Sequence, residues 1–399
     1  MELLAPAGNW EKLKTAYLYG ADAAYIGIKN FSLRAKADNF YEDDHQIVKR
    51  IKGPDKKLYC ALNIYFHDED IDRLLMELDY IQDYPIDAFI ISDIGIVKLL
   101  QKRFPLKELH LSTQANCINS DAAMAYADLG FSRIILGREM SLKQIERVKK
   151  RTGLEIEVFV HGAMCLAYAG RCFLSKYMAD RSANQGDCAH SCRWKFRVLE
   201  EEERPGQFFP VIQGEGFTSI LSSKDMMMID YLKELSDAGV DSLKIEGRMK
   251  SVYYTAIVTR AYRKALDAFY GIEVPDLQAY KDEIDKVSHR EFSTGFFFDK
   301  KDMDKTTQKS YLREYEFLGT IGEELEPGRF KLHVKNQIRT TDKLEYIGYD
   351  VLFLCDDVFA IFNEKGEPVT QADHMKDYII ETSQPVKEGY LIRKKKTAY

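Results

Sequence analysis

The stretch ELLAPAGNWEKLKTAYLYGADAAYIG, residues 2–27, contains one full unit of the pattern that decides the fold. Two short apolar segments, Glu2–Ala5 and Ala23–Gly27, have the composition of buried strands, and the amphipathic segment Trp10–Tyr19 lies between them. Gly20 stands where that helix must end before the next strand begins. Strand, helix and strand in this order predict a βα unit of a parallel sheet.

The same alternation continues along the chain. Further strands are predicted at Leu58–Ile64, Ala88–Ser92, Glu108–Ser112, Ser132–Leu136, Ile156–Val160 and Asp241–Glu246. Further helices are predicted at Asp43–Lys52, Asp68–Gln82, Ile94–Lys102, Ser120–Leu129, Leu142–Lys150 and Asp225–Ala238, and a last one ends near Tyr270. Gly130 and Gly239 follow their helices as Gly20 does. Eight strands with helices between them favour a (β/α)8 TIM-like barrel over a doubly wound open sheet.

The chain divides into two predicted domains. Residues 1–275 hold the barrel, and residues 276–304 are predicted to be a linker. From residue 305 to 399 the apolar residues alternate with a period of two, and glycine turns at Gly328, Gly366 and Gly389 separate the runs. This region therefore predicts a small C-terminal β-barrel domain that ends in a basic tail, Arg393–Lys396.

Four of the seven cysteines lie within 28 residues, at Cys165, Cys172, Cys188 and Cys192. They fall in a long insertion, about 161–224, that follows the seventh strand. Clustered thiolates indicate a metal or an iron–sulfur cluster, but the spacing C-x6-C-x15-C-x3-C does not choose between them. Buried apolar cysteines, two disulfides and a structural zinc remain alternatives, and His190 could replace one thiolate.

Polar residues gather where the predicted strands end. Active sites of such barrels lie at the carboxyl ends of the strands. The candidate catalytic residues are therefore His161, Glu139, Arg138, Gln114 and Glu246, with Asn63 and Asn116 on the same rim. After the last strand, the turn at Gly247 places Arg248 and Lys250 beside a helix N-terminus, an arrangement that suits a phosphate.

Composition excludes several classes of protein. The net charge is −6, so no global feature announces a nucleic-acid partner. Residues 161–198 are an exception, because this segment contains six Lys and Arg and only two acidic residues. No leader segment or membrane span is expected, which predicts a cytoplasmic protein with reduced thiols. The chain has no HExxH, G-x-S-x-G, Walker A or GxGxxG motif, so zinc hydrolysis and dinucleotide binding lose support.

The segment from Glu157 to Ser175, EVFVHGAMCLAYAGRCFLS, resembles the hallmark of the U32 peptidase (collagenase-like) family, with Ala169 in place of the usual Ser. The stretches at 192–211, 222–267 and 286–298 are similar to the branch of tRNA 5-hydroxyuridine modification proteins. The resemblance implies prephenate-dependent hydroxylation of C5 of the wobble uridine, with a 4Fe-4S cluster, or alternatively zinc, bound by the four clustered cysteines. It also leaves open a U32-type peptidase, a hydroxylase of ribosomal RNA, and a partner subunit of the same family.

The implied partner is a tRNA anticodon loop. An unpaired base needs a stacking surface, and its neighbouring phosphates need cations. The aromatic candidates are Tyr168, Phe173, Tyr177 and Trp194, and the cationic candidates are Arg171, Lys176, Arg193, Lys195, Arg248 and Lys250.

Overall fold

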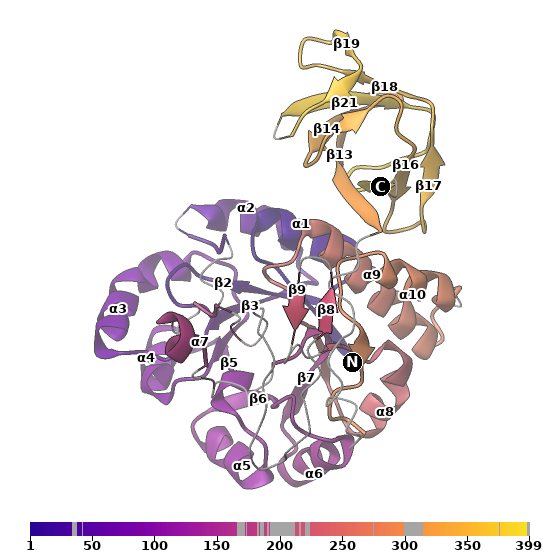
Figure 1. Cartoon of the computed structure of the whole chain (residues 1–399). Helices are drawn as coiled ribbons and strands as arrows, with labels where there is room; N and C mark the ends of the chain where they lie inside the picture. The colour runs from indigo at the N-terminus through magenta and orange to yellow at the C-terminus, as the bar shows by residue number, and fades with distance from the viewer. Residues whose placement is uncertain are drawn as a thin grey trace.

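The computed structural model of the chain describes residues 1–33, 38–41, 43–165, 172, 174–181, 183, 187–189, 191, 212–214, 217–219, 224–273, 275–298, 314–374 and 376–396. The chain forms a large α/β part and a small all-β part (Figure 1). No helix in these residues is long and apolar enough to cross a membrane.

Eight parallel strands form a closed barrel. They are β1 (Glu2–Pro6), β2 (Ala23–Gly27), β3 (Lys57–Leu62), β4 (Ala88–Ile91), β5 (Glu108–Leu111), β6 (Phe131–Ile135), β7 (Glu155–Ala163) and β11 (Ser242–Ile245). Each pairs with its neighbour in sequence, and β11 closes the barrel by pairing with both β1 and β7. The predicted TIM-like barrel is confirmed.

Helices surround the barrel (Figure 1). They are α1 (Trp10–Leu18), α2 (Asp44–Ile51), α3 (Asp68–Gln82), η1 (Ile94–Ile96), α4 (Val97–Arg103), η2 (Thr113–Ala115), α5 (Ser120–Asp128), α6 (Leu142–Thr152), η5 (Ile229–Tyr231), α8 (Leu232–Asp237) and α9 (Val252–Phe269). Gly20, Gly130 and Gly239 have φ values of 104°, 98° and 79°. These left-handed conformations end the helices at the predicted glycines.

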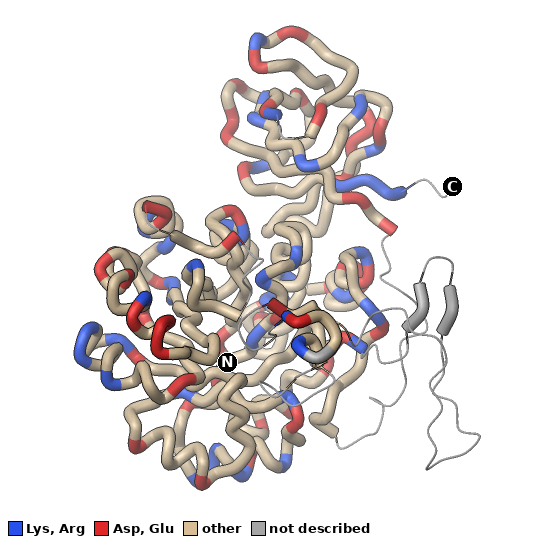
Figure 2. The backbone as a smooth tube through the Cα atoms, turned by 60° about the vertical axis from the view of Figure 1, so that its left-hand side comes forward, with Lys and Arg blue, Asp and Glu red and all other residues tan. Residues whose placement is uncertain are grey.

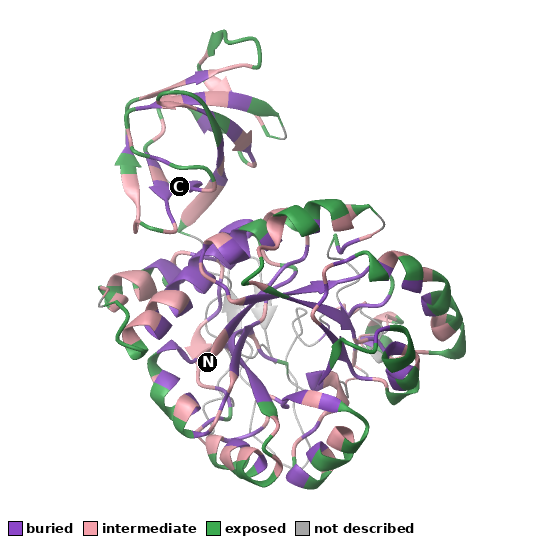
Figure 3. Ribbon diagram, turned by 180° about the vertical axis from the view of Figure 1, so that it is seen from behind, coloured by how far each residue is buried: buried purple, intermediate pink, exposed green. Residues whose placement is uncertain are grey.

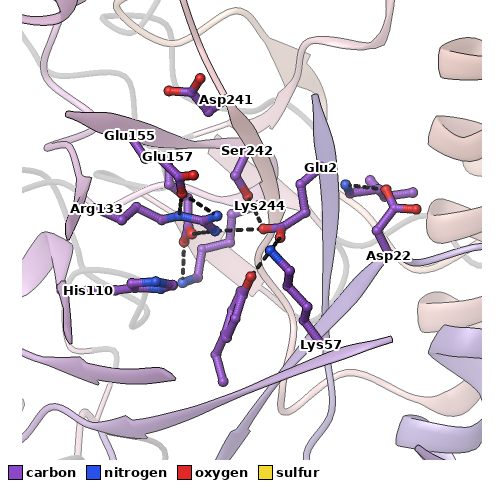
Figure 4. A network of polar contacts seen from close by, with 12 residues as sticks. Glu2, Asp22, Lys57, His110, Arg133, Glu155, Glu157, Asp241, Ser242 and Lys244 are labelled. Atoms are coloured by element: carbon purple, nitrogen blue, oxygen red, sulfur yellow. Dashed lines mark hydrogen bonds and ion pairs between the residues drawn. The ribbon is translucent and has the colours of Figure 1, made fainter. Parts of the chain in front are cut away.

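Inside the barrel, an apolar layer lies above a charged one. The apolar layer is a cluster of inward-facing residues: Leu4, Ala23, Tyr25, Tyr59, Ala61, Ala88, Ile90, Ile135 and Phe159. Toward the amino ends of the strands, Arg133 donates to Glu2 at 2.6 Å and to Glu157 at 3.2 Å (Figure 4). Lys244 donates to the other oxygen of Glu157 at 2.7 Å. These buried charges satisfy one another, so the lower layer closes the barrel.

The predicted helix Asp225–Ala238 is wrong at its start. Residues Asp225–Met227 form strand β10, which pairs antiparallel with the end of β7. A tertiary contact overrides the helical pattern, because the buried carboxylate of Asp225 accepts from Nε and Nη2 of Arg290 at 3.0 and 2.6 Å. The cysteine insertion therefore begins and ends on two adjacent strands. Within it lie α7 (Leu174–Ala179), β8 (Ile212–Gly214) and β9 (Phe217–Ser219).

The segment predicted as a linker, 276–304, contains α10 (Leu277–Asp285) and β12 (Phe292–Ser293). Strand β12 pairs with β10 and extends the sheet beyond the barrel wall. On α10, the ring of Tyr280 lies 5.2 Å from the guanidinium of Arg260 in α9. Both elements thus pack on the barrel.

The C-terminal part is an antiparallel sheet curled around its own apolar core (Figure 3). Eight strands follow the order β17-β16-β22-β13-β14-β21-β18-β19, and β15 pairs with β20. Their bounds are β13 (Tyr315–Glu326), β14 (Arg329–Val334), β15 (Ile338–Arg339), β16 (Leu344–Ile347), β17 (Leu354–Asp356), β18 (Phe359–Phe362), β19 (Pro368–Val369), β20 (Gln371–Ala372), β21 (Asp377–Thr382) and β22 (Leu391–Lys395).

Buried polar side chains join the two parts. Arg260 donates to the carbonyls of Val351 and Leu352 at 2.8 and 2.9 Å. Arg393 is fully buried and donates to Glu283 at 2.6 and 3.0 Å. The first residue of the predicted basic tail, Arg393, is therefore buried, because this cation neutralises a carboxylate buried between the domains.

Candidate active site at the barrel mouth

An arginine–glutamate pair lies at the carboxyl ends of the strands. Arg138 follows β6 and Glu246 follows β11, and Nη2 of Arg138 donates to Oε2 of Glu246 at 3.1 Å. Their side chains are only 9% and 14% exposed. The guanidinium also stacks on Phe159, with 3.8 Å between Cζ and the ring centroid. Two predicted catalytic residues are thus brought together above the apolar layer.

The backbone of Glu246 is held on both sides. Its N–H donates to the carbonyl of His161 at 2.9 Å. Its carbonyl accepts from the hydroxyl of Tyr254 at 2.9 Å. Burial raises the pKa of Tyr254 well above its usual value, so this hydroxyl remains a donor at neutral pH. The carboxylate therefore stands on a fixed backbone, as a preorganised site requires.

Amide side chains occupy the rim above β3 and β5. Gln114 lies in η2, and its backbone carbonyl, not its side chain, accepts from the hydroxyl of Tyr65 at 3.3 Å. Asn63 accepts from the N–H of Leu33 at 3.2 Å. Asn116 is left-handed at φ 53°, and its buried Nδ2 has no hydrogen-bond partner among the residues that the structure describes. Glu139 follows Arg138 and is half-buried, with Oε2 beside Gly137.

His161 faces away from the barrel interior. Strand β7 carries one extra residue, Val160, between the pairs Phe159–Lys244 and His161–Ile245. This bulge turns His161 outward, where its ring lies 5.6 Å from Tyr262 and 5.4 Å from Phe292. Burial lowers the pKa of His161 to about 3, so the imidazole is neutral. The structure does not bring it to the Arg138–Glu246 pair.

The cysteine module starts where β7 ends. Cys165 is exposed at that point, and Cys172 and Cys188 are half-buried; all three are free thiols. Two contacts join the chain around Cys172 to the chain around Cys188: Ser175 accepts from the N–H of Ala189 at 2.8 Å, and Arg181 donates to the carbonyl of Cys188 at 3.4 Å. Cys192 and His190 lie outside the described residues.

The predicted RNA-binding cations divide into three sets. Lys176 is exposed and pairs with Asp180. Arg248 is buried, and Lys250 is half-buried and donates to the carbonyl of Ser288 at 3.1 Å. Arg171, Arg193 and Lys195 fall outside the described residues, as do Tyr168, Phe173 and Trp194, and the side chain of Tyr177 is not described either. Elsewhere Lys and Arg are interspersed with Asp and Glu along the chain (Figure 2).

Residues 8–307 match Peptidase family U32, and residues 313–393 match the Peptidase family U32 C-terminal domain. The chain belongs to Peptidase family U32. The matches of this U32 protein cover the barrel from the loop after β1 onward and the curled sheet up to β22.

Relatives of this U32 protein carry three kinds of name. It is 35% identical to tRNA hydroxylation protein P1 of Bacillus subtilis, over 94% of this chain and 89% of that protein. It is 37% identical to a 23S rRNA 5-hydroxycytidine synthase of Escherichia coli, over 67% of this chain and 39% of that protein. It is 29% identical to a collagenase of Porphyromonas gingivalis, over 88% of this chain and 90% of that protein.

Sequence reasoning missed two exposed apolar residues at the mouth of the barrel. Trp10 begins α1 just after β1, and its side chain is 48% exposed. Met249 follows β11 and is 50% exposed. Strands β1 and β11 pair, so both residues lie on one side of the rim. A large apolar residue directly after a barrel strand was the signal that could have found them.

Proposed function

We propose that this U32 protein is a tRNA-modifying enzyme that hydroxylates C5 of the wobble uridine, with prephenate as co-substrate and an iron–sulfur cluster as cofactor. The Arg138–Glu246 pair carries the proposal. It lies at the catalytic end of the barrel, and His161 O links Glu246 to the strand that leads into the cysteine module. Names of relatives that act on tRNA and rRNA support an RNA substrate.

The pair has the chemistry to hold a uracil. A uracil edge presents two carbonyl acceptors and one N–H donor. A guanidinium donates to a carbonyl, and a carboxylate accepts from N–H. Phe159 beneath Arg138 gives this edge an apolar floor. An anticodon-loop base is already unpaired, so placing it here costs little unstacking.

Four thiols are the donor set that the proposed cluster would use, although no three potential ligands converge among the residues that the structure describes. Cys165, Cys172 and Cys188 are thiols rather than disulfides, and hydrogen bonds from the side chains of Ser175 and Arg181 to the backbone join the segments of the last two. These three and Cys192 would be the ligands, and a bound cluster would supply electron-transfer chemistry. We expect the proposed enzyme to act in the cytoplasm, where thiols stay reduced.

A matched pair of strains tests the proposal. Nucleoside analysis of tRNA from a strain without the gene should show loss of the hydroxyuridine derivative, and the restored gene should return it. Unchanged tRNA would contradict the proposal. Loss of a hydroxycytidine from ribosomal RNA would favour the rRNA function instead, and cleavage of collagen peptides by purified protein would favour the peptidase suggested by the collagenase relative.

A further inference from the structure

The side chain of Arg248 turns into the barrel instead of outward. Arg248 is only 3% exposed. Ala23 and Tyr25 of β2 face the interior, so by alternation Gly27 does too. A Cβ placed on Gly27 would lie 2.0 Å from Nη1 of Arg248. The guanidinium therefore occupies the space that a side chain at position 27 would fill, at the top of the barrel.

A hydroxyl converges on the same place. The Cβ position of Gly27 is 2.6 Å from Oγ of Ser32, a residue that is 3% exposed. This Oγ has no hydrogen-bond partner within the part of the chain that the structure describes. Below them lies Tyr25, whose ring centroid is 6.0 Å from Cζ of Arg248. The same Cβ position is 2.7 Å from Oδ1 of Asn39, so a cation, a hydroxyl and a side-chain amide share one small polar site on an aromatic floor.

Lysine and glycine support the backbone of this site. Nζ of Lys12 donates to the carbonyl of Arg248 at 3.2 Å. A Cβ on Gly8 would lie 2.4 Å from the same carbonyl oxygen, so only glycine allows this approach. The turn that carries Arg248 is therefore fixed against the loop after β1.

The depth of Arg248 selects its ligand. A phosphate of an RNA backbone stays on the surface, and a cation that grips it must be reachable there. A small molecule can enter the mouth instead. The planar guanidinium fork matches a carboxylate with two parallel hydrogen bonds, and a neighbouring hydroxyl adds a third.

We propose that Arg248 and Ser32, beside Gly27, bind a carboxylate group of the small organic co-substrate. This inference rests on the proposed function and assigns the co-substrate to one part of the mouth. Glu246 lies two residues before Arg248, so the carboxylate would be held next to the Arg138–Glu246 pair.

Prephenate binding to purified, cluster-loaded protein tests the site, measured by calorimetry without tRNA. Arg248→Met and Gly27→Ala should each weaken prephenate binding by about tenfold or more, since one removes the fork and the other fills its place. Ser32→Ala should have a smaller effect in the same direction. Binding of tRNA should be unchanged in all three. Matched controls are Arg50→Met, on the exposed face of α2, and Gly53→Ala, where a Cβ meets no atom within 4 Å.

Three results overturn the site. The first is wild-type prephenate affinity in folded Gly27→Ala and Ser32→Ala, which carry the test if Arg248→Met fails to fold. The second is weaker tRNA binding with unchanged prephenate binding, which makes Arg248 an RNA contact. The third is competition by inorganic phosphate as strong as that by phenylpyruvate, which marks a general anion site and contradicts the carboxylate assignment. If the variants lose prephenate while tRNA from the gene-deleted strain keeps its hydroxyuridine, the site stands and the proposed function fails.

Discussion

Nη2 of Arg138 donates to Oε2 of Glu246 across the mouth of the barrel, 3.1 Å away. The two residues are 108 positions apart in the chain, on the loops after β6 and β11. Between these loops stands β7, which continues into the cysteine module. The pair therefore connects the floor of the mouth, at Phe159, with the segment proposed to hold the cluster.

If this pair holds the target base, conservative changes should lower the rate of hydroxylation. Arg138→Lys and Glu246→Gln should each reduce it about 100-fold, the usual effect of losing one fixed hydrogen bond to a reacting group. The double variant should lose little more, because both residues act on one base. The measurement is the rate of hydroxyuridine formation in tRNA, with tRNA affinity measured separately.

The exposed pair Arg151–Asp121 provides a control. Its side chains are 49% and 80% exposed, so Arg151→Lys should leave the rate unchanged. Full activity in a folded Glu246→Gln variant would show that the base is held elsewhere.

The sequence predicts the barrel because its signal is repeated in every βα unit. It also predicts the face on which polar residues meet. The sequence does not predict which way each side chain points. One inserted residue in β7 turns His161 from the mouth to the outer wall. Burial of Arg248 depends on the missing side chain of Gly27, on a strand more than 200 residues earlier. Neither relationship is visible in local spacing.

Ion pairs between distant segments were equally hidden. Asp225 reads as the start of an amphipathic helix, but its buried contact with Arg290 and its pairing with β7 and β12 make it part of a strand. Arg393 reads as the first residue of a basic tail, and its ion pairs with the distant Glu283 and Glu345 explain its burial. In each case a tertiary contact outweighs the local pattern.

Cysteine substitutions should separate cluster ligands from other thiols. Anaerobically isolated protein should carry about four irons and four sulfides, and Cys188→Ser should lose them. Cys355→Ser is the matched control, because Cys355 is exposed on β17 of the other domain. The checks are the absorption spectrum and iron and sulfide analysis. A finding of stoichiometric zinc without iron would show that the cysteines bind zinc and not an iron–sulfur cluster.

His161 should make folding stability depend on pH. Burial lowers its pKa from 6.5 to about 3 in the folded chain. Between those values the unfolded chain binds one more proton, so stability is full above pH 6.5 and falls as the pH drops. From pH 7 to 5 this one group should cost about 2 kcal/mol.

The variant His161→Phe should lack that part of the pH dependence. Asp225, Lys250 and His289 also act on His161 electrostatically, and they remain in the variant. Urea unfolding at pH 7 and pH 5 measures the difference. If the unfolding free energy falls by the same amount from pH 7 to pH 5 in both proteins, His161 is not buried and neutral in solution.

Arg393 should stabilise the interface between the two domains. Arg393→Met removes the bidentate partner of the buried Glu283 and leaves Lys286 as its remaining partner, so the change should cost about 3 kcal/mol. Lys395→Met, at an exposed position on the same strand, should cost almost nothing. Thermal unfolding of both variants is the measurement. A melting temperature for Arg393→Met equal to that of wild type would mean that the Arg393–Glu283 ion pair is not formed in solution.

Trp10 should contribute to tRNA binding by stacking on a base beside the target. Its side chain is 48% exposed on the rim of the mouth, and Met249 on the neighbouring strand end is 50% exposed. Stacking on an aromatic ring is worth about 1–3 kcal/mol per base, so Trp10→Ala should weaken tRNA binding by that amount, and Trp10→Phe should retain most of the affinity. Leu106→Ala is the control, because Leu106 is 92% exposed just before β5, at the opposite end of the barrel. Thermal unfolding of each variant checks that a change in tRNA affinity does not come from loss of stability. Equal tRNA affinity in wild type and Trp10→Ala would place the flanking bases on the aromatic residues of the cysteine module instead.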